Sequence, residues 1–88
     1  MLTASSGHGW AKITWTQVPA ADTYEIYVKY PGAKSFKRAL TRPAKVKSVT
    51  HKGLKVGKTY QYVMRARRRI GSKYYYSPFS NVKTIRVK

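Results

Sequence analysis

The chain has 88 residues, and its 19 Lys and Arg face only two acidic residues, Asp22 and Glu25, so the formal net charge is +17. A chain of this length forms one domain with a small core. We therefore assign residues 1–88 to a single domain, with 1–9 as a loosely held first strand. The lack of cysteine excludes disulfides and thiolate metal sites. No stretch is apolar and long enough to span a bilayer as a helix, so we expect no membrane insertion.

From Trp10 onward, apolar and polar residues alternate in short segments that are separated by turn residues such as Pro31-Gly32. A period of two residues is typical of strands, and repeated short strands predict an all-β sandwich or barrel. After the first strand, the pattern predicts strands at about 10–16, 24–30, 36–40, 46–50, 59–67 and 74–87. Pro19 and Asp22 mark the turn between the first two of these, and Pro78 interrupts the last.

The alternation also predicts which side chains are buried. In the 24–30 strand, Tyr24, Ile26 and Val28 would face the core, whereas Glu25, Tyr27 and Lys29 would be exposed. In the 59–67 strand, the inward residues would be Tyr60, Tyr62, Met64 and Ala66. Val46 and Val49 are out of phase, which indicates a bulge or loop near that strand.

Several segments occur in a recognisable order along almost the whole chain. They are Ile13-Thr14-Trp15, a Pro and Ala turn into Tyr24-Glu25-Ile26-Tyr27, Leu54-Lys55-Val56-Gly57-Lys58-Thr59-Tyr60, Met64-Arg65-Ala66 and Ser77-Pro78-Phe79-Ser80-Asn81. In this order the chain resembles the fibronectin type III family, in particular the Lys- and Tyr-rich modules of secreted and surface proteins of Gram-positive bacteria.

The resemblance implies a seven-stranded immunoglobulin-like sandwich that acts as a spacer or adhesion module. The module would lie between neighbouring domains of a larger bacterial protein that is secreted or held at the cell surface. Its termini would lie at opposite ends of the sandwich, and we expect a monomer. The loop 68–73 contains no Arg-Gly-Asp, so integrin adhesion of the animal kind is not carried over.

A large Trp side chain in the second strand would fill the centre between the two sheets. The spacing of Leu54, Gly57 and Tyr60 fits a tyrosine corner, in which the hydroxyl group bonds to the preceding loop backbone. The expected core residues are Trp15, Tyr24, Ile26, Leu54, Gly57 at its bend, Tyr60, Tyr62 and Met64.

Groups for catalysis are scarce. The two carboxylates lie beside one turn, and His8 and His51, the latter expected in a loop, have no acidic neighbour in the sequence. Such distant His residues do not indicate a metal site, and no phosphate-binding glycine motif is present. We therefore expect no enzyme activity, no metal and no cofactor.

Basic residues crowd one strand and the loop that follows it. If the strand with Tyr27 and Lys29 neighbours the strand with Arg65 and Arg67, their outward side chains share one face. The candidate interaction residues are Tyr27, Lys29, Arg65, Arg67, Arg68, Arg69 and Lys73. Guanidinium groups form two-point hydrogen bonds with phosphate or sulfate, and aromatic rings stack on bases or sugars.

The sequence is compatible with several partners for this face. An anionic cell-wall polymer, a sulfated glycan, nucleic acid and an acidic neighbouring protein all fit the charge. The same residues also fit a solvated charged face, with a simple cross-strand contact between Tyr27 and Val63. Two further alternatives are a polyanion-binding or nucleic-acid-binding domain in its own right and an engineered cationic scaffold.

Overall fold

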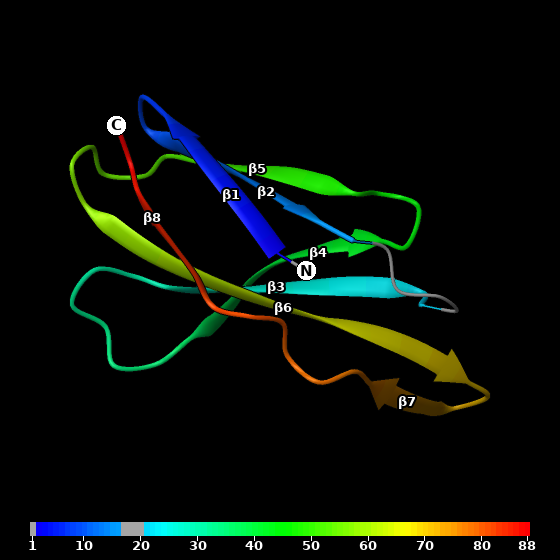
Figure 1. Ribbon diagram of the computed structural model, residues 1–88. Coiled ribbons are helices and arrows are strands. Elements are labelled where there is room, and N and C mark those ends of the chain that lie inside the picture. Colours follow the sequence, from blue (N-terminus) through cyan, green and yellow to red (C-terminus); the bar gives the residue numbers. More distant parts are fainter. Residues whose placement is uncertain (1, 17–20) are drawn as a thin grey trace.

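The computed structural model describes residues 2–16 and 21–88, and within these ranges the chain forms eight strands and no helix (Figure 1). The strands are β1 (Leu2–Gly7), β2 (Trp10–Trp15), β3 (Thr23–Lys29), β4 (Lys37–Pro43), β5 (Ser48–Lys52), β6 (Thr59–Ile70), β7 (Lys73–Tyr76) and β8 (Lys83–Arg86). The expected Pro19 turn lies outside the described residues. Across the described ranges, no helix is long and apolar enough to cross a membrane.

The strands form two antiparallel sheets that face each other. Sheet A has the order β1-β2-β5, and sheet B has the order β4-β3-β6-β7, with β8 also paired to β6. The chain passes from sheet A to sheet B after β2 and returns for β5 (Figure 1). An all-β fold with a sandwich-like arrangement, as the alternation predicted, is confirmed.

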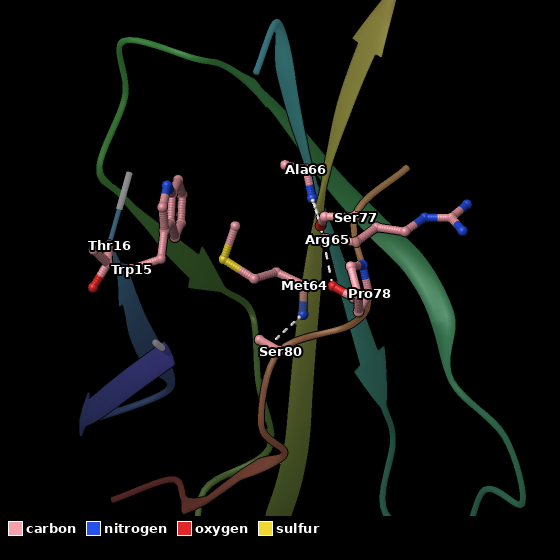
Figure 2. A pocket seen from close by; sticks show the side chains of 8 residues that line it. All are labelled: Trp15, Thr16, Met64, Arg65, Ala66, Ser77, Pro78 and Ser80. Carbon is pink, nitrogen blue, oxygen red and sulfur yellow. Dashed lines mark hydrogen bonds between the residues drawn. The ribbon is translucent and has the colours of Figure 1, made fainter. Parts of the chain in front are cut away.

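The prediction of seven strands is wrong because the last strand is split in two. β7 pairs with the end of β6, and β8 pairs with its beginning. Between them, Pro78 has no backbone N–H to continue the ladder. Ser77 and Ser80 compensate: their backbone N–H groups donate to the carbonyls of Ala66 and Met64, at 2.9 and 2.7 Å. Their hydroxyl oxygens accept from the N–H groups of the same two residues, at 2.8 and 3.0 Å (Figure 2).

The first strand has both backbone and side-chain contacts. β1 pairs with β2 along its whole length, from Leu2 opposite Trp15 to Gly7 opposite Trp10. Leu2 is fully buried, and the Asn81 side chain accepts from its N–H at 3.0 Å and donates to its carbonyl at 3.3 Å. The apolar contact of Leu2 and this double hydrogen bond attach β1 to the segment before β8.

The core lies between the inner faces of the two sheets. Ile13 and Trp15 from sheet A meet Tyr24, Ile26 and the inward residues of β6, all of them buried. The rings of Trp15 and Tyr24 are 5.4 Å apart and tilted by 57°. Within the described residues, the buried Nε1 group of Trp15 has no hydrogen-bond partner. The ring therefore contributes through apolar packing.

The turn before β6 has the geometry of a tyrosine corner. Tyr60 is buried, and its hydroxyl oxygen accepts from the backbone N–H of Lys55 at 2.9 Å. Gly57, expected among the core residues, is exposed, and its φ of 82° lies in the left-handed region that suits glycine. Its N–H donates to the carbonyl of Val87 at 2.7 Å, and Leu54 is buried beside the corner. This bend fixes where β6 begins.

Candidate interaction face

The register of sheet B brings the predicted residues of β3 and β6 onto one outward face. Glu25 pairs with Arg65, Thr23 with Arg67 and Tyr27 with Val63. Figure 2 shows the Met64 side chain extending toward Trp15, while the Arg65 side chain points to the opposite side of β6. Inward apolar residues thus fix the strand, and alternation then places the arginines outside.

Glu25 is the centre of this face, and its predicted exposure is wrong. The residue is only 1% exposed although it lies on the outward side of the sheet. Its Oε1 accepts from Arg65 Nε at 2.8 Å and from the Tyr27 hydroxyl at 3.2 Å. Its Oε2 accepts from Arg38 at 3.3 Å and lies 3.7 Å from an Arg67 nitrogen. Long side chains from β3, β4 and β6 therefore cover the carboxylate.

The surroundings of Glu25 favour its charged form. Burial would raise the pKa of this carboxyl, but hydrogen bonds from Arg65, Tyr27 and Arg38 and the charge of Arg65 outweigh it and hold the pKa below the usual value of 4.5. The carboxylate in turn raises the pKa of Arg65. The group is a fixed negative centre that orients the guanidinium groups around it.

Aromatic rings hold the same arginines from the other side. The Arg65 guanidinium carbon is 3.9 Å from the centre of the Tyr76 ring and 5.0 Å from that of Phe79. The Arg67 guanidinium lies 4.8 Å from the ring centre of Tyr74. Cation–π contacts of this kind contribute about 0.5–2 kcal/mol each. Arg65 and Arg67 therefore have defined positions, with side chains only 25% and 26% exposed.

Beyond Arg67, β6 continues with β7 as a projecting hairpin, which we call the arm (residues 68–76). Residues 68–76 are all exposed. In the described part of the chain, no carboxylate forms an ion pair with Arg68, Arg69 or Lys73. The base of the arm is braced, because Asp22 accepts from the Arg69 backbone N–H at 2.6 Å and donates its own N–H to the Arg67 carbonyl at 2.8 Å.

The seven predicted interaction residues thus fall into three groups. Tyr27, Arg65 and Arg67 lie together and contact Glu25 or each other. Arg68, Arg69 and Lys73 belong to the arm, where Arg68 pairs with Tyr75 and so faces away from Arg67 and Arg69. Lys29 pairs with Gln61 toward the other end of the sheet.

The sequence interpretation missed Glu25, Arg38, Tyr74, Tyr76 and Phe79. The place of Glu25 could have been recognised from the sequence, because the residue lies two positions before Tyr27 and therefore on the same face as Arg65. For the tyrosines, the run 74–76 indicated a strand but not its register. Arg38 is brought opposite Tyr27 by a bulge in the β3–β4 pairing after Ile26, which no pattern in the sequence marks.

His51 lies in strand β5 rather than in the predicted loop. Its Nδ1 is 2.9 Å from the hydroxyl of Tyr62 on the opposite sheet, and burial lowers the pKa of the imidazole below 6.5. Burial also raises the pKa of the Tyr62 hydroxyl. The pair is a polar contact inside the sandwich. Among the described residues, no group of His, Cys, Asp and Glu is suited to hold a metal ion.

Comparison with known proteins leaves the family of the chain open. No family model matches the sequence, and no curated protein matches it.

Proposed function

We propose that this chain is a non-catalytic, fibronectin type III-like interaction module that binds anionic polymers through its arm. The proposal rests on the braced hairpin, in which Arg68, Arg69 and Lys73 are exposed. Within the described residues, none of these three side chains forms an ion pair with a carboxylate. Cations that no internal acid neutralises attract polyanions, and a fixed base reduces the entropy lost on binding.

The fibronectin type III assignment is part of the proposal. It is supported by the two-sheet arrangement, by the buried Trp15 and by the tyrosine corner formed by Tyr60 and the Lys55 backbone. The resemblance also suggests placement in a bacterial protein that is secreted or exposed at the cell surface. There the module would act as a monomeric spacer and would contact a cell-wall polymer or a sulfated glycan.

The described ends of the chain lie apart. Leu2 pairs with Trp15 at one end of β2, whereas the Lys88 carbonyl accepts from Gly9 N–H beyond the other end. Leu2 and Lys88 therefore lie at opposite ends of sheet A. Modules with this geometry can follow one another in a string without crossing.

The test is retention on immobilised heparin, duplex DNA and anionic cell-wall polymer across a salt series. The triple variant Arg68→Ser, Arg69→Ser, Lys73→Ser should lower the slope of log affinity against log salt on duplex DNA by about 2–3, since each phosphate contact contributes about 0.9. The control Lys12→Ser, Lys45→Ser, Lys52→Ser removes the same charge from exposed positions elsewhere. Equal slopes for both triple variants would refute binding by the arm.

Nucleic acid is a second candidate ligand, and the shape of the arm favours it. The arm is a two-stranded ribbon with Arg and Tyr side chains on both faces, and the major groove of duplex DNA admits a ribbon of this kind. Preference for duplex DNA over heparin at equal salt would support this candidate. Retention ranked only by the charge density of the ligand would instead support general polyanion binding.

A further inference from the structure

Beside the arginine cluster, the outward face of sheet B contains an apolar hollow. Its volume is about 370 Å³, and it is lined by Tyr27, Phe36, Val63, Phe79, Ser80 and Val82. Pockets for small ligands begin at about 300 Å³, so the hollow has room for one large apolar side chain. Phe79 and Val82 remain about half exposed there, which leaves apolar surface in contact with water.

The polar groups in the hollow already have partners. The Ser80 hydroxyl accepts from Met64 N–H and donates to the Asn81 carbonyl at 3.0 Å. The Tyr27 hydroxyl donates to Glu25 and accepts from Arg65 at 3.2 Å. Because these hydroxyl groups are already engaged, a sugar or a nucleotide base would find hydrogen-bond partners only at the border of the hollow. The lining itself therefore favours an apolar side chain.

Guanidinium groups border the same hollow. Arg65 lies 5.0 Å from the centre of the Phe79 ring and donates to the Tyr27 hydroxyl. Arg38 pairs with Tyr27 across the sheet, and its side chain is 56% exposed. Both groups keep N–H donors beyond those used by Glu25, because a guanidinium has five. The border therefore favours carboxylates next to the apolar side chain.

We propose that this hollow binds an acidic peptide segment of a partner protein, inserting one apolar side chain whose flanking carboxylates contact Arg38 and Arg65. Charge complementarity favours an acidic peptide over a second copy of the chain. A second copy of the chain has a net charge of +17 and two acids, both used internally, so it would be repelled. The inference goes beyond polymer binding by the arm and uses different residues.

The probe is a short fluorescent peptide with one phenylalanine between flanking glutamates, compared with the same peptide carrying alanine at the centre. Burial of the phenylalanine should make binding to the unaltered protein about tenfold tighter by fluorescence anisotropy. Val82→Ser should abolish the difference between the two peptides, and so should Phe79→Ala. Neither change alters the charge of the protein.

The matched control for Val82→Ser is Val56→Ser, because these valines are 53% and 51% exposed and Val56 lies in the turn before β6. This control should keep the tenfold preference. Equal affinity of the unaltered protein for both peptides would overturn the proposal, as would a preference that survives in both hollow variants. Loss of the preference in Val56→Ser would also overturn it.

Two further measurements separate this site from the arm. The arm variant Arg68→Ser, Arg69→Ser, Lys73→Ser should keep the tenfold preference even where its heparin retention falls. Heparin retention should in turn be unchanged in Val82→Ser. If Val82→Ser lost heparin or anionic vesicle binding together with the peptide preference, the occupant would be the polymer or a lipid surface, and the peptide proposal would be wrong.

Discussion

Replacement of Glu25 by glutamine tests whether a buried carboxylate organises the outward face of sheet B. The change keeps the shape of the side chain, but it removes the charge that Arg38, Arg65 and Arg67 contact. The amide group would also direct N–H donors at guanidinium donors. The arginines would then lose a fixed partner on a surface that is already strongly positive.

The size of the effect follows from the contacts. The hydrogen bond from Arg65 at 2.8 Å is charged and largely covered, and such bonds contribute about 1.5–3 kcal/mol. The pair with Arg38 involves an exposed side chain and contributes less than about 1 kcal/mol. We therefore expect a loss of about 2–4 kcal/mol, a large part of the 5–15 kcal/mol that is typical of whole proteins.

The assay is thermal and urea unfolding followed by circular dichroism, where the unfolding temperature should fall by about 10 °C or more. Asp22→Asn is the matched control, because it changes the net charge equally at an exposed carboxylate whose replacement keeps an oxygen acceptor for Arg69 N–H. Its cost should stay below about 1 kcal/mol. A loss in Glu25→Gln no greater than in Asp22→Asn would refute the organising role of Glu25.

Two further changes test the interior. Tyr60→Phe removes the acceptor for Lys55 N–H and should cost about 1–3 kcal/mol in urea unfolding, whereas Tyr75→Phe at an exposed position should cost nothing measurable. His51 has its pKa lowered by burial, so the unfolded chain takes up a proton at a higher pH than the folded chain. The free energy of unfolding should therefore be highest above about pH 6.5. It should decrease as the pH falls through the pKa that His51 has in the folded chain. His51→Gln should remove this decrease in stability. It should leave the separate decrease below about pH 4.5, which arises from protonation of Glu25. If the pH dependence of stability were the same in His51→Gln, the interpretation would be contradicted.

The strands with strict alternation could be predicted because burial on one face repeats every second residue. In β6, Tyr60, Tyr62, Met64 and Ala66 all face the core, and their spacing alone indicates that side. The β5 region was harder, because its two valines are out of phase. Val49 is in fact the buried residue, opposite Ile13, and this register places His51 inside the sandwich.

The rest could not be predicted because it depends on contacts between distant segments. Alternation places Glu25 on the outward face, but the arginines that cover it together with Tyr27 come from β4 and β6. The split of the last strand depends on Ser77 and Ser80 using their hydroxyl groups in place of backbone acceptors. A sequence pattern indicates the side on which a residue lies, whereas exposure also depends on what folds over it.

The positions of the two acids bear on why the chain is so basic. Cations kept only for solubility would place no demand on where Asp22 and Glu25 lie. Yet Glu25 binds Arg65 in the middle of β6, and Asp22 binds the Arg69 backbone at the base of the arm. Both negative groups thus hold the strand that carries the exposed arginines. Because an ordered strand loses less entropy on binding than a mobile one, this placement is consistent with the proposal that the arm contacts a ligand.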